Sequence, residues 1–363
     1  MTTPRRIRVA VIFGGRSPEH GVSAVSAGSV IGALDPGEFE VVPVGITRDG
    51  QWVLTDGSGL ALDGRNMPEI TSGSGSAVVL PGDPTAKGLV VVDPVEGVRA
   101  LGDVDVVFPV LHGAFGEDGT IQGLFEMAGI PYVGSGVFGS AAAMDKEFTK
   151  KLAVAEGIPT GPYVVLRAGQ SLSGEDQERL GLPVFVKPAR GGSSFGITKV
   201  NSWADLDAAV ATARQVDPKV LIEAAIVGRE VECGVLEGEA GGAPEASVLA
   251  EITVTGHEFY DFEAKYLDES CVYDIPAGLP EQVTAKIREY ARRTFVALDC
   301  AGLARVDFFV TPEFDVYLNE INTMPGFTST SMFPRMWAAT GLDYPKLVNR
   351  LIQTALRRGS GLH

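Results

Sequence analysis

Four polar side chains near the C-terminus have the types and the spacing of a site for metal-bound phosphate: Arg305, Asp307, Glu320 and Asn322. They form two pairs, and the members of each pair are two residues apart in an apolar run, so they share one face of a strand. A tight turn around residues 313–314 would place Asp307 opposite Glu320. The same register would place Arg305 opposite Asn322. Facing carboxylates repel one another unless a cation lies between them, and hard oxygen ligands of this kind suit Mg²⁺.

The alternative for this hairpin is a solvent-exposed face with incidental acidity. Val306, Phe308 and Val310 fill the opposite face of the first strand, which predicts a sheet with one apolar and one polar side. The pattern therefore favours the metal site. Residues 323–332, which follow the hairpin, are rich in hydroxyls and could cradle a carboxylate or an oxyanion, although alone they would be an ordinary polar loop.

A second candidate for phosphate binding is the loop Lys187-Pro-Ala-Arg-Gly-Gly-Ser-Ser-Phe-Gly196, which lies between two predicted strands. Its glycines would let the backbone approach a polyphosphate closely and turn N–H groups toward it. Lys187 would add positive charge at the end of the preceding strand. A plain hairpin turn explains the same residues about equally well.

The glycines Gly134, Gly136 and Gly139 spell the GxGxxG pattern of dinucleotide sites. Such a site needs a full buried strand before the glycines, inside a βαβ unit of roughly 30 residues. Only residues 130–133 precede them, and this short run contains a proline. We interpret the glycines as a linker between domains. The P-loop pattern GxxxxGKS/T does not occur in the sequence, which excludes that kind of nucleotide site.

The elements that must position these residues follow from the apolar periodicity. Near the N-terminus, predicted strands alternate with predicted helices, which favours a parallel sheet with crossover helices. Residues 55–100 are rich in Gly, Ser, Asp and Pro and indicate a surface elaboration with short strands and turns. The predicted strands are 8–15, 40–47, 105–111, 163–166, 183–187, 196–200, 220–226, 230–236, 248–254, 304–311 and 316–322. The predicted helices are 20–34, one beginning near 119, 145–156, 202–214, 280–298 and one at the C-terminus.

The chain carries 46 acidic and 30 basic residues, a formal net charge of −16. Such a surface repels nucleic-acid backbones and anionic membranes, so we expect neither as a partner. No apolar stretch approaches the ~18–20 residues that span a bilayer, and the N-terminal segment lacks the features of a secretory signal. We therefore expect a cytoplasmic protein. Its cysteines, Cys233, Cys271 and Cys300, lack metal-ligand spacing.

In this order, these segments resemble the D-alanine–D-alanine ligases, a family of the ATP-grasp superfamily. The segments that carry the resemblance are 19–23, 112–119, 144–146, 187–196, 223–230, 260–266, 305–307 and 320–332. The resemblance implies a fold of α/β and α+β type, with an ATP-grasp fold preceded by an N-terminal α/β domain with a parallel sheet. The expected boundaries are 1–134 for the N-terminal substrate domain, 135–224 for the central ATP-grasp subdomain and 225–363 for the C-terminal subdomain.

The resemblance also assigns residues to an ATP site between two antiparallel sheets. Lys146 and Lys187 would hold the α- and β-phosphates, and Lys265 the γ-phosphate. Glu223 and the backbone near Ile226 would bind adenine, and Glu230 the ribose. Asp307, Glu320 and Asn322 would bind two Mg²⁺ ions, with Mn²⁺ as a possible replacement and a monovalent cation as a possible activator.

The substrate site that the resemblance implies is built around Glu19, which would anchor the ammonium group of a first D-alanine, with His112 near its carboxylate. Ser193 and Tyr266 would join Glu19 in a hydrogen-bonded link that closes residues 260–274 as a lid. Ser331 and Met332 would receive the carboxylate of a second D-alanine. Arg305 and the Gly326 amide would stabilise the oxyanion. Two positions depart from the family: Ala224 stands where lysine is common, and Met332 where leucine is common.

The implied activity is ATP-dependent ligation of two D-alanines through a D-alanyl phosphate, for peptidoglycan precursor synthesis, by a homodimer. Alternatives are a ligase that takes D-serine or D-lactate as second substrate, and a nucleotide-binding relative without catalysis. The complete set of Arg305, Asp307, Glu320 and Asn322 speaks against the last alternative, because binding alone would not need all four.

Overall fold

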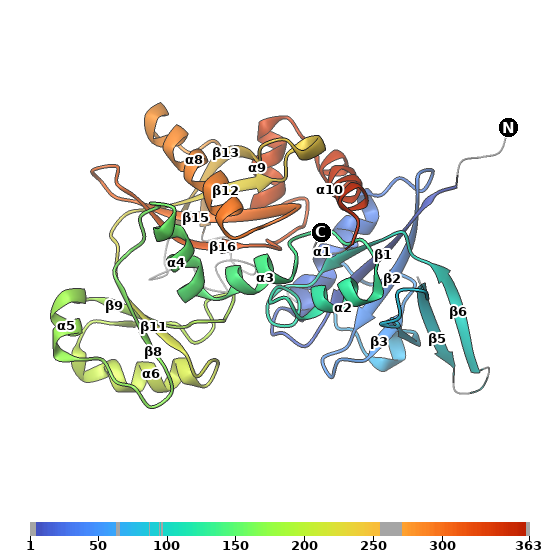
Figure 1. Cartoon of the computed structure of the whole chain (residues 1–363), viewed down its shortest axis with the longest axis horizontal. Coiled ribbons are helices and arrows are strands. Elements are labelled where there is room, and N and C mark those ends of the chain that lie inside the picture. The colour runs from blue at the N-terminus through green and yellow to red at the C-terminus, as the bar shows by residue number, and fades with distance from the viewer. Residues whose placement is uncertain are drawn as a thin grey trace.

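The computed structural model describes residues 5–62, 66–86, 88–93, 95, 97–254 and 271–360. Most of the lid predicted at 260–274, with Lys265 and Tyr266, lies outside the described residues. Within them, the strands form three sheets, which Figure 1 shows as three separate layers with helices packed on them. No helix of the described part of the chain is long and apolar enough to cross a membrane.

The N-terminal sheet has seven strands in the order β6-β5-β4-β3-β2-β1-β7. The three strands β2, β1 and β7 at one end of this order are parallel, because β1 pairs in parallel with both β2 and β7. The other four strands continue the sheet as an antiparallel meander. The strands are β1 (Ile7–Gly14), β2 (Phe39–Ile46), β3 (Trp52–Leu54), β4 (Ser76–Val79), β5 (Gly88–Asp93), β6 (Gly97–Asp103) and β7 (Val106–Val110).

The region at 55–100, which is rich in Gly, Ser, Asp and Pro, contributes to the N-terminal sheet and to its core. It supplies β4, β5 and β6, and it also packs against α1 (His20–Ala33), the helix that follows β1. Leu60 and Ile70 are each only 5% exposed, and the Ile70 amide donates a hydrogen bond to His20 Nε2 over 2.9 Å. A Cβ atom added at Gly28 of α1 would lie 3.0 Å from Leu60 Cβ, so this helix depends on a small residue there. Composition did not predict this packing.

The second sheet is a four-stranded antiparallel sheet in the order β10-β9-β11-β8. Its strands are β8 (Tyr163–Leu166), β9 (Val184–Pro188), β10 (Thr198–Val200) and β11 (Val220–Ala224), and its helices are α5 (Gly174–Leu180) and α6 (Leu206–Arg214). Helix α6 packs on β9, β10 and β11 around a small apolar core of its own (Figure 1). The other face of this sheet is left for the cleft.

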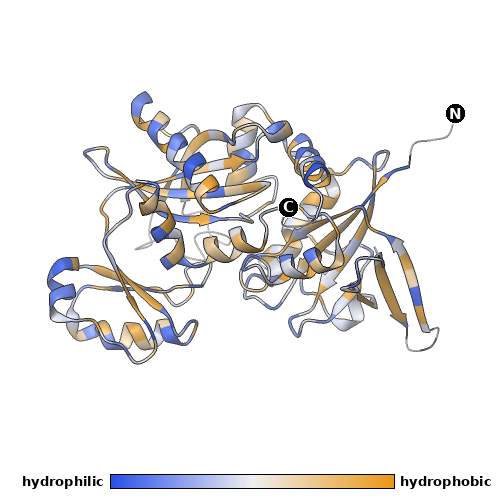
Figure 2. Ribbon diagram, in the orientation of Figure 1, coloured by the Kyte–Doolittle hydropathy of each residue, from blue (hydrophilic) through white to orange (hydrophobic). Residues whose placement is uncertain are grey.

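The third sheet is a five-stranded antiparallel sheet in the order β14-β13-β12-β15-β16. Its strands are β12 (Arg229–Leu236), β13 (Glu245–Val254), β14 (Cys271–Asp274), β15 (Leu303–Val310) and β16 (Val316–Asn322). Helix α8 (Glu281–Ala297) packs on β12, β13 and β15, and α9 (Met332–Thr340) packs on β12 and β13. Figure 2 shows that apolar residues concentrate in the strands, while the outer faces of helices such as α8 are polar.

Three further helices connect the sheets: α2 (Thr120–Ala128), α3 (Val137–Met144) and α4 (Lys146–Ala155). Short 3₁₀ turns lie at Ser72–Ser74, Trp203–Asp205 and Glu239–Gly241. The GxGxxG glycines lie where α3 begins: Gly134 has a φ of +105°, and Gly139 packs inside α3 against the backbone of Asp299. The last helix, α10 (Tyr344–Arg358), returns to the N-terminal sheet and contacts α1 and β7.

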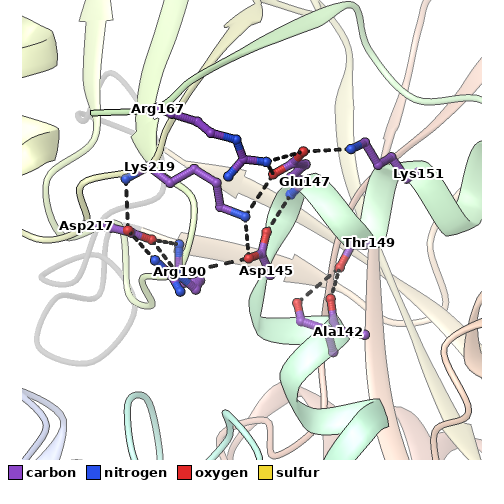
Figure 3. Close-up of polar contacts among 10 residues, drawn as sticks. Ala142, Asp145, Glu147, Thr149, Lys151, Arg167, Arg190, Asp217 and Lys219 are labelled. Carbon is purple, nitrogen blue, oxygen red and sulfur yellow. Dashed lines mark hydrogen bonds and ion pairs between the residues drawn. The ribbon is translucent and has the colours of Figure 1, made fainter. Parts of the chain in front are cut away.

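A buried cluster of charges anchors the start of α4, as Figure 3 shows. Lys219 Nζ lies 2.5 Å from Asp145 Oδ2 and 2.9 Å from Glu147 Oε2. Burial opposes the ionisation of Glu147, but Lys151 and Lys219 outweigh it and lower the pKa of Glu147 to about 2. Beside this group, Asp217 accepts hydrogen bonds from the backbone and guanidinium of Arg190. The cluster therefore fixes α4 against β11 and against the start of the glycine loop.

Candidate active site

A cavity of about 340 Å³ opens between the four-stranded and the five-stranded sheet, where ATP was predicted to bind. Its walls come from α4, β9, the glycine loop, β11, β12, β15 and β16. All the described residues predicted to bind the nucleotide line it: Lys146, Lys187, Glu223, Ile226 and Glu230. Two of the three predicted metal ligands, Asp307 and Glu320, line it as well. Residues from three parts of the sequence thus meet in one cleft.

A second cavity, of about 300 Å³, lies between the N-terminal sheet and the end of β16. The predicted catalytic and substrate residues that line it are Glu19, Ser193, Arg305, Gly326, Ser331 and Met332, and the predicted metal ligand Asn322 lines it too. The two cavities share Lys146, the glycine loop at 191–193, Arg305 and Glu320 as walls. A molecule in the second cavity would therefore lie next to the phosphate end of the first.

The polar face of β15 and β16 has the register that the sequence predicts. Asp307 pairs with Glu320, and Arg305 pairs with Asn322. The prediction missed a bulge after Asp307, which moves Phe308 opposite Leu318. A bulge of this kind adds twist to the strand and commonly lies beside a functional site. It is set by local backbone geometry, which alternation of residue types does not encode.

A third carboxylate, from Glu232 on β12, lies in register opposite Asp307 and was missed by the sequence prediction. Arg305 Nε lies 3.1 Å from Glu232 Oε1, and its guanidinium donates to both oxygens of Asp307 over 2.8 and 2.7 Å. The cation between them offsets the repulsion of the paired acids. The available signal was the spacing of Glu230 and Glu232, two residues apart on a predicted strand.

The lysines of the nucleotide cleft are held by carboxylates. Lys187 Nζ lies 2.6 Å from one oxygen of Glu223, and Lys150 Nζ lies 2.8 Å from the other. Burial opposes the charge on Glu223, but the two lysines outweigh it and hold the pKa of Glu223 well below its usual range. Burial likewise opposes the charge on Lys187, yet Glu223 raises the pKa of Lys187. Glu223 and Lys187 are therefore both charged at neutral pH.

Lys146 and Lys150 are the two lysines that α4 points into the cleft. Lys146 Nζ donates to the Gly191 carbonyl over 2.9 Å and lies 3.5 Å from Glu320 Oε2. Sequence reasoning selected Lys146 but missed Lys150, although residues four apart lie on the same face of a helix. That spacing was the signal that could have found it.

Glu19 connects the N-terminal sheet to the glycine loop. The Ser193 hydroxyl donates a hydrogen bond to Glu19 Oε1. Glu19 is the residue before α1, but its side chain makes no capping hydrogen bond to that helix. Its carboxylate is thus directed at the loop, which disfavours the simpler interpretation of a helix cap. Ser193 and its neighbour Ser194 have φ values of +48° and +59°.

His112 lies behind the wall of the substrate cavity and does not line it. Its Nδ1 donates to the Met324 carbonyl over 2.9 Å, and its Nε2 lies 3.2 Å from the Ser26 hydroxyl. Burial lowers the pKa of His112, so the ring is neutral at pH 7. Ser26 does line the cavity, so His112 reaches a bound substrate only through this hydroxyl in the present geometry.

Glu117, which the prediction did not select, lines the substrate cavity beside Glu19. Its carboxylate accepts hydrogen bonds from the amides of Gly113 and Met324. Burial and the charge of Glu19 raise the pKa of Glu117 to about 8. It thereby joins the 112–119 turn to the loop after β16, which forms the far wall of the cavity.

That far wall ends in a helix N-terminus. Ser331 precedes α9, and its side chain makes no capping hydrogen bond to that helix. Instead Ser331 Oγ accepts from the Thr328 amide over 3.1 Å and lies 2.7 Å from the Thr328 hydroxyl. Free amides and the positive end of the helix dipole favour a carboxylate at this place.

Two family models match the chain, one on each side of residues 136–151. The model described as D-ala D-ala ligase N-terminus matches residues 8–135, and the one described as D-ala D-ala ligase C-terminus matches residues 152–353. The D-alanine–D-alanine ligase of Mycobacterium avium (strain 104) is 60% identical over 370 residues, which cover 100% of both chains.

The chain belongs to the D-alanine–D-alanine ligase family. Solved structures of this family agree with its fold. The D-Ala:D-Ser ligase VanG of Enterococcus faecalis matches with a TM-score of 0.83 and 36% identity, over 97% of this chain and 100% of that one. The D-alanine–D-alanine ligase of Coxiella burnetii matches with a TM-score of 0.83 and 34% identity, over 97% and 94%.

Family membership makes the chain an ATP-dependent ligase with the ATP-grasp fold, as the sequence predicts. Its two antiparallel sheets flank the first cavity, and residues of α1 and of the 112–119 turn line the second. Every described residue of the predicted site except His112 lines one of the two cavities. The roles of these residues stay predictions.

Proposed function

We propose that this ligase joins two D-alanines to D-alanyl-D-alanine, a precursor of peptidoglycan, through a D-alanyl phosphate. The observation that carries the proposal is the contact between the two cavities at Arg305 and Glu320. In this arrangement the phosphate end of a bound nucleotide would lie beside a pocket lined by the Glu19 carboxylate, which suits an ammonium group. The 60% identity to a D-alanine–D-alanine ligase over the full length supports this substrate.

The nucleotide would lie with its adenine against Glu223 and the backbone of Ile226 and with its ribose on Glu230. Lys146 and Lys187 would hold the α- and β-phosphates, and Lys265 the γ-phosphate. The clustering of the described members of this set in one cleft supports the assignment.

The metal would be held by Asp307, Glu320 and Asn322. In the described part of the chain, no three His, Cys, Asp or Glu side chains form a metal-binding group. Two facing carboxylates and a carboxamide nevertheless fit Mg²⁺, since this ion takes few protein ligands and completes its shell with water and phosphate. Two Mg²⁺ ions, or Mn²⁺, would neutralise charge on the transferring phosphoryl group. A monovalent cation is a further expected activator.

The chain's own residues would then serve two steps. Glu19 would hold the ammonium group of the first D-alanine. The carboxylate of that D-alanine would attack the γ-phosphorus, giving the acyl phosphate and ADP. Ser331 and Met332, at the start of α9, would orient the carboxylate of the second D-alanine. When the amine of the second D-alanine, after losing a proton, attacks the acyl carbon, Arg305 and the Gly326 amide would stabilise the oxyanion, an effect of ~3–4 kcal/mol per donor in well-studied sites. The bond from the acyl carbon to the phosphate oxygen then breaks, and phosphate leaves as the peptide bond forms.

The cavity would also have to exclude water, because an exposed acyl phosphate hydrolyses. The Glu19–Ser193 hydrogen bond closes one side of it. Tyr266 would extend this link to the lid. As His112 lies behind the wall, we propose that it orients Ser26 and the loop at Met324 beside the first D-alanine.

A second candidate function is a ligase that takes D-serine as its second substrate. It is favoured by the equal TM-scores, 0.83, of the D-Ala:D-Ser ligase and of the Coxiella burnetii ligase, because the fold alone does not separate the two. D-Lactate is a further alternative as second substrate.

The experiment follows phosphate release and product mass for the purified protein with ATP, Mg²⁺ and D-alanine. Mixtures of D-alanine with D-serine or D-lactate, and L-alanine alone, are run in parallel. We expect D-alanyl-D-alanine as the main condensed product. A dominant mixed product would move the assignment to the second candidate, and ATP binding without any turnover would contradict the catalytic role.

We further propose three domains, 1–134, 135–224 and 225–363, and a homodimer in the cytoplasm. The separation into three sheets supports the domain boundaries. Light scattering tests the dimer, and a monomer at assay concentration would exclude it. Fractionation of the producing cells tests the compartment.

A further inference from the structure

The glutamate at the end of β11 is shared by two lysines, only one of which the proposed function uses. Glu223 Oε2 lies 2.6 Å from Lys187 Nζ, and Glu223 Oε1 lies 2.8 Å from Lys150 Nζ. The Lys150 side chain is 3% exposed, yet it lines the nucleotide cleft. Its ammonium group also lies 5.8 Å from the centre of the Tyr163 ring on β8.

We propose that Lys150 is a positioning residue of the nucleotide site, which acts on ATP through Glu223 and Lys187. The inference rests on the proposed binding of ATP in this cleft. By occupying one oxygen of Glu223, Lys150 limits Lys187 to the other oxygen and fixes where the Lys187 ammonium can reach.

The charges of this group give the reason. Two ammonium groups and one carboxylate carry a net charge of +1, which suits a polyphosphate. Without Lys150 the remaining pair is neutral, and both oxygens of Glu223 become available to Lys187. The Lys187 ammonium would then be drawn toward β11 and away from the phosphates. A buried charge that loses its partner is costly, which drives this rearrangement.

The position of α4 adds a second reason. This helix contacts β16 and α8 of the five-stranded sheet, whereas Glu223 and Lys187 belong to the four-stranded sheet. Figure 1 shows α4 between the two sheets. The Lys150–Glu223 ion pair therefore crosses from one wall of the cleft to the other and fixes their separation at the adenine end. Lys146 makes the corresponding connection at the phosphate end, from Gly191 to Glu320.

Anchoring α4 in the fold does not require Lys150, because another group does it. Asp145, Glu147 and Lys219 hold the start of the helix (Figure 3), and none of them lines the nucleotide cleft. Lys151 provides a matched control. It is adjacent to Lys150, its side chain is 55% exposed, and its partner Glu147 keeps Lys219 and Arg167.

The test compares Lys150→Met, Lys150→Arg and Lys151→Met in the full chain. Calorimetry measures the Kd of Mg·ATP, steady-state kinetics measures KM and kcat, and thermal unfolding checks folding. We expect Lys150→Met to raise the Kd and KM of ATP by roughly 10-fold or more, on the scale of a buried charge partner lost. The KM of D-alanine should stay near wild type. Lys150→Arg should recover most of the ATP affinity, and Lys151→Met should match wild type.

A double-mutant cycle with Glu223→Gln separates positioning from a general loss of packing. If Lys150 acts through Glu223, Lys150→Met should have little further effect on the Kd of ATP in the Glu223→Gln background. Additive effects, or wild-type ATP affinity in a folded Lys150→Met protein, would overturn the proposal. If Lys150→Met does not fold, the cycle is run with Lys150→Arg and Lys150→Gln. ATP binding is measured without D-alanine, so a failure of the proposed ligation leaves this test intact.

Discussion

At the scale of single residues, the site is a set of charges that balance one another. Arg305 forms ion pairs with both Asp307 and Glu232, and Glu223 forms ion pairs with both Lys150 and Lys187. The chain as a whole carries −16, but the charges that line the nucleotide cleft balance. Five basic side chains face five acidic ones: Lys146, Lys150, Lys187, Lys199 and Arg305 against Glu223, Glu230, Glu232, Asp307 and Glu320. An anionic nucleotide can therefore enter without meeting uncompensated carboxylates.

The role of Arg305 can be separated from nucleotide binding by substitution. Arg305→Ala should lower kcat by about 10²–10³-fold, the usual effect of losing one oxyanion donor. The Kd of ATP should change much less, because the lysines of α4 and β9 remain. Arg305→Lys keeps a charge near Asp307 but loses the planar guanidinium, so its kcat should lie between those of the wild type and of Arg305→Ala. Turnover of the Ala variant close to wild type would remove the oxyanion role.

At the scale of elements, two helical glycines that look alike in sequence differ in what surrounds them. In α3, a Cβ atom added at Gly139 would lie 2.7 Å from the Asp299 carbonyl oxygen, too close for any real contact. In α2, a Cβ atom at Gly123 would meet nothing within 4 Å. The first glycine is required by packing, and the second is not.

Alanine substitutions at these glycines should therefore change stability in opposite directions. Gly139→Ala should lower the free energy of unfolding by about 1–3 kcal/mol through overpacking. Gly123→Ala should raise it by about 0.5–1 kcal/mol, since alanine is the better helix former. Chemical denaturation of both variants measures the difference. An unchanged Gly139→Ala protein would mean that the α3 packing against Asp299 is looser than described.

Local patterns predicted the elements well. Strands 163–166 and 316–322 were predicted to the residue, and the Asp307–Glu320 register followed from counting across one turn. Residues brought in from other elements were missed: Lys150, Glu232 and the bulge after Asp307. The spacing of Lys150 from Lys146 and of Glu232 from Glu230 was a signal, but only contacts across the cleft show that these side chains join the site. The bulge depends on local backbone geometry, which the alternation of residue types does not encode.

At the scale of the whole molecule, the last helix ties the two ends of the chain together. Leu347, Leu351 and Ile352 of α10 are buried in one apolar cluster with Val9 and Val11 of β1. The same cluster includes Phe327 from the loop after β16, whose carbonyl accepts a hydrogen bond from Tyr344 over 2.6 Å. The wall of the substrate cavity is thus continuous with the N-terminal core.

This shared core predicts that the N-terminal sheet and the C-terminal sheet unfold together. Leu351, which is 1% exposed, leaves a cavity when it is truncated, and Leu351→Ala should cost about 2–5 kcal/mol. Because α10 closes both the N-terminal core and the loop at Phe327, the variant should lose stability in one cooperative transition. Calorimetry follows the whole transition, and fluorescence of single-tryptophan versions that keep only Trp52 or only Trp337 follows the two sheets separately. Two separated transitions would show that α10 belongs energetically to one sheet only, and the substrate cavity would then have to be assembled between independently stable halves.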